Sequence, residues 1–376
     1  MIKNILLLPT TDNIVSNWKN VYLDLTTKGF NTYIIADNIN ITKDIPTGLK
    51  KIDFFASRLL QLDTFTFIQK IILFLYIRKY ANHILHYYKI DIVIVSNDNA
   101  PVQNIFVNAA KKLGITTVLH QAAGILAKPT PNSFIKRIKI KVTKKLFGIS
   151  SSKNIGSNVD FCLIQGIQWT NYIDNKNFKI IGNQFYRDLL DILKKVPLQE
   201  VQNYKKKYHL NKKTITFFSQ PFKELSICSI NNIDQLYTDL LNLQTLLEKQ
   251  GIYEFIFKPH PQESYYKNFN FHKIINDTDL NSLILASDIC ITVFSTVAIQ
   301  TKIASKTTIG FTPNYLPSDI LKQMENTFDF KSSSITELFN FINDENHTSN
   351  HNFNDIVDMT CDTKIEVYNF IRENTL

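Results

Sequence analysis

Short runs of β-branched and apolar residues alternate along the chain with longer stretches at helical spacing. This alternation is typical of βαβ units, whose strands pair in parallel. A first series of runs lies at 4–10, 31–37, 91–98, 116–121, 160–166 and 179–183. A second series lies at 214–220, 254–260, 273–277, 288–295 and 307–311. The sequence therefore predicts an α/β protein with two Rossmann-like domains, each built on a parallel sheet.

The chain length of 376 residues fits two domains of ordinary size. We place their junction near residues 184–200, with a hinge around Pro197. The helical spacing of the tail predicts a last helix from Asn352 to Glu373. We therefore expect three parts: an N-terminal domain over 1–190, a C-terminal domain over 191–350, and a helical segment over 351–376 for which packing on the N-terminal domain is one arrangement.

Composition narrows the class of protein. The chain is 44% hydrophobic and 20% charged, as globular proteins are. Its most apolar run, from Ile71 to Ile77, is far shorter than the ~20 residues of a membrane-spanning helix, and the opening MIKNILLLPTTD is too short in its apolar part for a signal peptide. The four cysteines are widely spaced, which favours free thiols in a reducing compartment. We expect a cytoplasmic protein, and the net charge of +9 favours anionic partners.

Ligands of open parallel sheets bind beyond the carboxyl ends of the strands, so residues just after each strand are candidates for a site. In FIFKPHPQE, a strand runs into Lys258, Pro259, His260 and Pro261. The two prolines fix the backbone on either side of His260 and remove two N–H donors. The motif favours a functional histidine, and a loop histidine that only caps a neighbouring carbonyl is the alternative.

The second candidate is DICITVFSTVAIQ, in which Ser295 and Thr296 stand between a strand and a helix. Free N–H groups and hydroxyls at a helix N-terminus can bind a phosphate. Simple N-capping by Ser295 is equally consistent with this pattern.

KPHP followed by a strand and FST resembles the C-terminal, donor-binding domain of GT-B glycosyltransferases of bacterial surface polysaccharide synthesis. The similar enzymes are capsule-type Kdo, sialyl and polysialyl transferases and, more distantly, CDP-glycerol glycerophosphotransferases. KIIGNQFYRDLL resembles their IGNPR-D segment, and VSNDNAPVQNIFVNAAKKLGITTVLHQAAGI resembles the segment that ends in their QHG. The resemblance spans roughly residues 90–312.

The resemblance implies two domains facing a cleft and a transfer that needs no metal and no cofactor. It implies that His260 contacts the donor phosphate, and that Ser295 and Thr296 bind this phosphate or a sugar carboxylate. The neighbouring residues implied for the donor site are Lys258, Pro261, Gln220 and Pro221. The preferred donor is a CMP-activated ulosonic acid of the Kdo, sialic or pseudaminic type, and a UDP-sugar or CDP-glycerol is the alternative. The acceptor is an oligosaccharide or lipid-linked glycan of capsule, O-antigen or lipooligosaccharide.

An inverting transfer needs a general base, and a side chain at a strand end of the first domain is its natural source. Asp98, directly after DIVIV, is our first candidate, with a helix N-cap as the equal alternative. Asp12, in the loop after the first strand, is the second candidate. Where similar enzymes carry QHG, this chain reads HQAAG, so His120 and Gln121 remain acceptor-side candidates and a histidine base is in doubt.

Two further segments have two interpretations each. Asp277 and Asp279 in NDTD imitate a metal-binding DxD, although helix capping explains them better. The basic and apolar residues of 134–148 suit either contact with an anionic membrane, at the inner face of the cytoplasmic membrane, or a solvated surface.

Two other classes of function are weaker. The positive charge suggests nucleic-acid binding, but no recognised module is present, so we expect no nucleic-acid partner. The HQAAG departure is the feature that favours a two-domain scaffold without activity.

Overall fold

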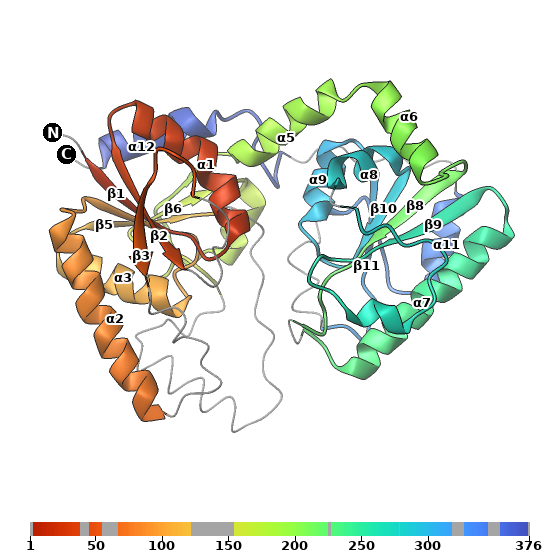
Figure 1. Ribbon diagram of the computed structural model, residues 1–376, viewed down its shortest axis with the longest axis horizontal. Helices are drawn as coiled ribbons and strands as arrows, with labels where there is room; N and C mark the ends of the chain where they lie inside the picture. Colours follow the sequence, from red (N-terminus) through yellow and green to blue (C-terminus); the bar gives the residue numbers. More distant parts are fainter. Residues whose placement is uncertain are drawn as a thin grey trace. The chain divides into compact units, whose positions relative to one another are not determined.

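The computed structural model describes residues 3–37, 45–54, 67–121, 154–224, 227–277, 279–317, 327–344 and 354–374. These residues form two compact units (Figure 1). Unit 1 contains the described residues up to Phe185 and those from Val357 onward, and unit 2 contains those within Tyr186–Ile356.

Unit 1 is built on a seven-stranded sheet in the order β3-β2-β1-β4-β5-β6-β7, and every neighbouring pair is parallel. Strands β1 and β4 at its centre are almost continuously apolar and buried, as expected for a sheet covered on both faces. The strands are β1 (Asn4–Leu8), β2 (Asn31–Asp37), β3 (Lys50–Phe54), β4 (Ile92–Val95), β5 (Thr116–His120), β6 (Phe161–Ile164) and β7 (Phe178–Ile180).

The helices of unit 1 are α1 (Asp12–Thr27), α2 (Phe67–Tyr87), α3 (Pro101–Lys112), the 3₁₀ helix η2 (Ile167–Tyr172), α5 (Gln184–Lys195), which continues into unit 2, and α12 (Thr363–Glu373). Helices α1 and α12 lie side by side (Figure 1). Val367, Phe370 and Ile371 of α12 share one apolar core with Val21 and Leu25 of α1. The end of the chain therefore completes the core of its first half.

Unit 2 is built on a five-stranded sheet in the order β12-β11-β10-β8-β9, again with every pair parallel. Its strands are β8 (Lys213–Phe218), β9 (Tyr253–Lys258), β10 (Ile289–Thr292), β11 (Thr307–Phe311) and β12 (Phe330–Ser332). Its remaining helices are α6 (Leu198–Lys207), α7 (Ile230–Lys249), η3 (Tyr265–Asn268), α8 (Leu280–Ala286), α9 (Val297–Ile303) and α11 (Ile335–Asn343). The predicted α/β class with two parallel sheets is confirmed.

Four elements differ from the sequence-based prediction. The expected strand at 273–277 is reduced to one bridge between Ile274 and Phe257. Strands β3 and β12 had no counterpart in the prediction. The last helix begins at Thr363 rather than at Asn352, because Asp362 caps it by accepting hydrogen bonds from the Lys364 and Ile365 backbone N–H groups.

Candidate functional site

The carboxyl edge of the unit 2 sheet brings the predicted donor-site residues together. Strand β8 lies between β9 and β10. Phe218 at the end of β8 is in register with Lys258 of β9 and with Thr292 of β10, so the three strands end level. The loops after them therefore start side by side, and they carry Gln220 and Pro221, Pro259 to Pro261, and Ser295 with Thr296.

His260 has a defined proton arrangement. Its Nδ1 accepts a hydrogen bond from the Gln262 backbone N–H at 3.2 Å, which leaves the proton of a neutral imidazole on Nε2. Burial and the nearby Lys258 charge lower the pKa of His260, so the ring is neutral at pH 7. A neutral ring with Nε2–H can donate one hydrogen bond to an anionic ligand such as a phosphate oxygen.

Glu263 closes the His260 loop and was missed by sequence reasoning. Its Oε1 accepts hydrogen bonds from Ser219 Oγ at 2.9 Å and from the Tyr237 hydroxyl, and its Oε2 accepts from the His260 backbone N–H at 3.1 Å. The residue is buried, and burial raises the pKa of its carboxyl to about 7. An acid three residues after His260 in the same loop was the available sequence signal. Glu263 therefore ties the His260 loop, which follows β9, to Ser219 after β8 and to Tyr237 of α7.

Gln220 joins two of the three loops. Its side chain is buried, and Oε1 accepts a hydrogen bond from the Phe294 backbone N–H at 3.3 Å. The neighbouring Pro221 is buried and Pro261 is exposed. Gln220 thus fixes the distance between the loops that follow β8 and β10.

Ser295 and Thr296 are half-buried residues at the start of α9. Ser295 Oγ accepts a hydrogen bond from the Val297 backbone N–H at 3.3 Å. Thr296 occupies the N-cap position without a side-chain capping bond. Lys258 is also half-buried, its Nζ donates to the Pro259 carbonyl at 3.4 Å, and burial lowers the pKa of its ammonium group. This edge combines hydroxyl, imidazole and ammonium donors, which suits an anionic ligand.

In unit 1, the structure gives Asp98 a structural position. Its carboxylate is fully buried, and its two oxygens accept hydrogen bonds from the Gly156 and Asn158 backbone N–H groups at 2.9 and 3.0 Å. It does not cap α3, whose N-cap is Ala100. Burial raises the pKa of Asp98 despite these bonds. Asp98 therefore holds the segment before β6, and its complete burial keeps the carboxylate out of contact with solvent.

His120 and Gln121 are also buried within unit 1. His120 Nδ1 and the Tyr22 hydroxyl are 2.7 Å apart, and the imidazole stacks on Trp18. Burial lowers the pKa of His120 to about 3, so the ring is neutral. Gln121 Oε1 accepts from the Gln165 backbone N–H at 3.2 Å. Both side chains pack within unit 1, and their place on the acceptor side stays a prediction.

Asp12 has a different environment. It opens the first turn of α1, just beyond the carboxyl end of β1, and it is half-buried. Both candidate bases lie beyond the carboxyl ends of the neighbouring parallel strands β1 and β4, where ligands bind, and Asp12 is the less buried of the two.

The remaining predictions are resolved in part. Asp279 caps α8 by accepting from the Ser282 backbone N–H at 3.0 Å, which confirms the capping interpretation for this residue. Asp277 accepts from the Tyr208 hydroxyl at 2.6 Å and from Lys207 Nζ at 3.0 Å. The basic segment 134–148 lies outside the described residues. In the part of the chain that the structure describes, no helix is both long and apolar enough to cross a bilayer.

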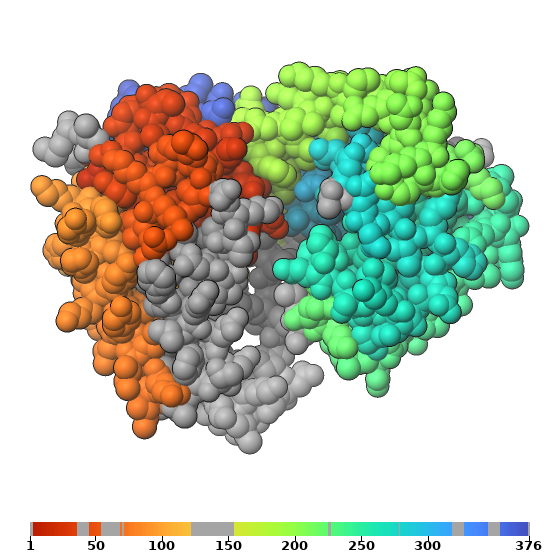
Figure 2. All heavy atoms as spheres, in the orientation of Figure 1, coloured from red at the N-terminus to blue at the C-terminus, as the bar shows by residue number. Residues whose placement is uncertain are grey.

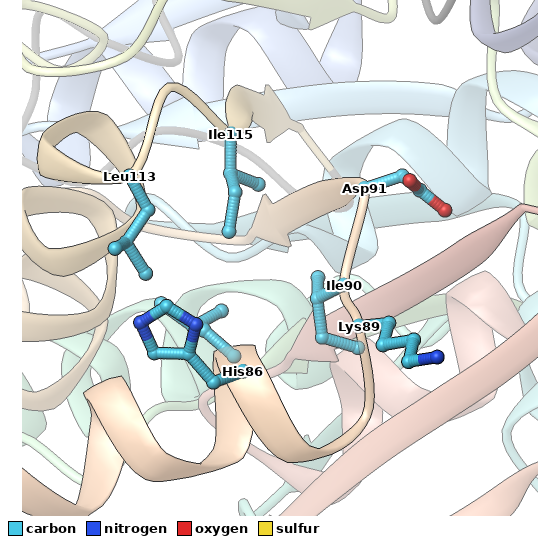
Figure 3. Close-up of a pocket in the computed structure, with 7 residues that line it drawn as sticks. His86, Lys89, Ile90, Asp91, Leu113 and Ile115 are labelled. Atoms are coloured by element: carbon cyan, nitrogen blue, oxygen red, sulfur yellow. The ribbon is translucent and has the colours of Figure 1, made fainter.

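A pocket of about 300 Å³ lies at the opposite, amino-terminal edge of the unit 1 sheet (Figure 3). It contains none of the predicted site residues. Asp91 at its rim already accepts a hydrogen bond from the Asn4 backbone N–H at 2.7 Å. Its lining residues are Leu85, His86, Lys89, Ile90, Asp91, Leu113 and Ile115.

No protein-family model matches the chain, and no curated protein matches it in sequence. Solved structures of similar fold cover nearly the whole chain. A UDP-GlcNAc 2-epimerase from Methanocaldococcus jannaschii, in complex with UDP-GlcNAc and UDP, has a TM-score of 0.59 at 13% identity, over 99% of this chain and 100% of that one. A glycosyltransferase from Rickettsia africae has a TM-score of 0.57 at 16% identity, over 100% of this chain and 94% of that one.

The wall teichoic acid polymerase TagF has a TM-score of 0.55 at 15% identity, over 99% of this chain and 88% of that one. At these identities the likeness establishes the fold alone. The fold is that of GT-B proteins, with two parallel-sheet α/β units, as the sequence predicted.

Proposed function

We propose that this protein is a GT-B glycosyltransferase that transfers a sugar from a nucleotide-activated donor to a glycan acceptor in bacterial surface polysaccharide synthesis. The observation that carries the proposal is the convergence of His260, Ser295 and Thr296 at one edge of the unit 2 sheet. In the proposed division of labour, residues 191–350 bind the donor and residues 1–190 bind the acceptor.

The spacing of the strands suits a ligand the size of a nucleotide phosphate group. His260 follows β9 and Ser295 follows β10, with β8 between them. Two strand spacings separate these loops by about 10 Å at the backbone. A nucleoside phosphate placed over Gln220 would be within reach of the imidazole on one side and of the hydroxyls on the other. The neutral Nε2–H of His260 would donate to a phosphate oxygen.

The donor preference rests on the resemblance of the KPHP and FST segments to Kdo and sialyl transferases, so we propose a CMP-activated ulosonic acid. Ser295 and Thr296 would then bind the phosphate or the sugar carboxylate. The M. jannaschii epimerase binds UDP-GlcNAc and UDP, which supports a UDP-sugar as the alternative donor. The fold of the TagF polymerase supports CDP-glycerol as a third.

For the general base we now favour Asp12 over Asp98. Asp12 is half-buried beyond the carboxyl end of β1, whereas Asp98 is fully buried and both its oxygens accept backbone hydrogen bonds. Asp12 would take the proton from the acceptor hydroxyl as the sugar is transferred, in a displacement that needs no metal.

The test is a calorimetric and thermal-shift titration of the wild type with CMP, CDP, UDP and GDP. We expect CMP to bind tightest and its affinity to fall at least about 10-fold in His260→Ala, because one charge-assisted hydrogen bond is lost. His272→Ala is the matched control, since His272 is an exposed histidine of the same unit that pairs with Glu248. Tightest binding of UDP or CDP would change the donor, and no nucleotide binding at all would contradict the proposal.

A second candidate is an enzyme that epimerises UDP-GlcNAc, favoured by the full-length fold likeness to the archaeal epimerase. Proton NMR of UDP-GlcNAc incubated with the protein, without an acceptor, separates the two. Conversion of the sugar would support the epimerase, and an unchanged spectrum would support the transferase.

A further inference from the structure

Helix α2 exposes a long apolar surface. The outer face of α2, which we define as Ile68, Ile72, Leu75, Tyr76, Lys79, His83 and Tyr87, follows helical spacing over about 28 Å. Its apolar members are 56–69% exposed: Ile68, Ile72, Leu75, Tyr76 and Tyr87. The opposite side of the helix packs into unit 1 through Leu73, Ile77, Ala81, Ile84 and Leu85. The helix is therefore apolar on two sides although only one of them is buried.

The charge of α2 has one sign. The helix contains no aspartate or glutamate. Lys79 lies within the outer face and Arg78 beside it, and both are exposed. These two cations follow the apolar group Ile68 to Tyr76 directly, and two exposed aromatic rings come after them. Apolar side chains next to basic and aromatic ones are typical of helices that lie in the interface of an anionic membrane.

The aromatic side chains of this face are held by their neighbours. Tyr76 stacks on Tyr80 with ring centroids 6.4 Å apart, and Tyr87 stacks on His83 at 5.6 Å. Tyr80 in turn donates a hydrogen bond to the Asp53 carbonyl of β3 at 2.9 Å. The rings therefore stack on neighbouring rings at the surface of unit 1. Helix α2, orange in Figures 1 and 2, lies at that surface.

We propose that the outer face of α2 docks on an anionic lipid bilayer. Ile68, Ile72 and Leu75 enter the boundary between headgroups and acyl chains, and Arg78 and Lys79 bind lipid phosphates. The helix lies on the bilayer and does not span it, in agreement with its insufficient hydropathy for crossing. A second copy of this chain fits less well, because a symmetric contact through this face would bring two clusters of like charge together. This surface is separate from the proposed donor site and does not depend on it.

The experiment is co-sedimentation of the full chain with vesicles of phosphatidylglycerol and phosphatidylcholine, compared with phosphatidylcholine alone, at low and high salt. Ile72→Gln combined with Leu75→Gln should weaken binding at least about 10-fold, since two apolar anchors are lost. Arg78→Gln combined with Lys79→Gln should weaken it about 30-fold and reduce the salt dependence.

Matched variants remove two apolar side chains or two cations elsewhere on the chain. Ile192→Gln with Ile365→Gln changes two isoleucine side chains on helices α5 and α12, which are 52% and 50% exposed respectively. Lys206→Gln with Lys249→Gln removes two exposed cations of unit 2. Both control pairs should bind vesicles as the wild type does, and circular dichroism melts should show that all variants fold.

Three results would overturn the proposal. The first is a wild type that does not bind anionic vesicles, and the second is binding that the α2 variants leave unchanged. The third is a dimer in light scattering that Ile72→Gln with Leu75→Gln converts to a monomer, which would assign the face to a second copy of the chain.

Discussion

At the scale of single residues, Glu263 couples the candidate site to pH. Burial raises its pKa to about 7, above the ordinary value of 4.5. Between these pH values the unfolded chain loses the proton of Glu263 while the folded chain keeps it, so folding stability falls as pH rises. In Glu263→Gln this dependence is absent. Urea unfolding from pH 4.5 to 8 should show the wild type losing up to about 3 kcal/mol relative to the variant.

Glu337→Gln is the control for this measurement. The Ser333 backbone N–H donates to the Glu337 carboxylate and holds its pKa below the usual range, so the wild type should lose stability relative to this variant as pH falls. Equal slopes for Glu263→Gln and the wild type would mean that Glu263 titrates normally.

Substitutions of the two candidate bases should have opposite effects: one should lower mainly the stability and the other mainly the transfer rate. Asp98→Asn replaces an oxygen that accepts a backbone N–H with an amide, so it should destabilise unit 1 by about 1–3 kcal/mol. Asp12→Asn should cost about 1 kcal/mol or less and lower the transfer rate about 10²–10⁴-fold. Urea unfolding measures the stability of each variant, and a transfer assay with the donor identified by titration measures its rate. Full activity in Asp12→Asn would remove it as the base.

The sequence located the candidate residues at strand ends but not the direction of their side chains. His260, Ser295 and Thr296 could be located because strand ends follow from runs of apolar residues. Asp98 follows a strand in the same way, yet its carboxylate turns inward because the Gly156 and Asn158 N–H groups, far away in sequence, need acceptors. No pattern around Asp98 contains that information.

At the scale of elements, the junction of β7 and α5 depends on Gly182. Its φ is +69°, and a Cβ at this position would lie 2.4 Å from the Asp358 carbonyl oxygen of the returning C-terminal segment. Gly182→Ala should therefore cost at least about 2 kcal/mol. Gly29→Ala is the control, because Gly29 also has a positive φ but open space around it, and it should cost about 1 kcal/mol. Equal losses in thermal or urea unfolding would show that the contact with Asp358 carries no energy.

Elements that depend on distant partners escaped prediction. Strand β3 has the sequence KKIDF, in which Ile52 is buried while Lys50, Lys51 and Asp53 are exposed, and it pairs with β2 at the edge of the sheet. Strand β12 has only three residues and pairs with β11. The segment 273–277 has a strand-like composition, but one bridge to Phe257 is its whole pairing. Local propensity decides such short segments less than the sheet beside them does.

At the scale of the whole molecule, each unit has its own apolar core. Ile371→Ala in α12 removes a fully buried side chain from the core of unit 1 and should destabilise that unit by about 2–5 kcal/mol. Calorimetry should show two transitions, of which the variant lowers one. A nucleotide at 100 times its Kd should raise the free energy of unfolding of unit 2 alone, by about 2.7 kcal/mol, and so move only the other transition. A single transition that shifts both in Ile371→Ala and on addition of nucleotide would show that the two units do not unfold independently.

The return of α12 to unit 1 has a consequence for the order of synthesis. The ribosome makes all of Tyr186–Ile356 before it reaches the helix that carries Val367, Phe370 and Ile371. At ~5–20 residues per second, this interval lasts on the order of ten seconds or more. During that time unit 2 can complete its fold, whereas the part of the unit 1 core that α12 covers remains exposed to solvent. The first half of the protein to be made is therefore the last to be finished.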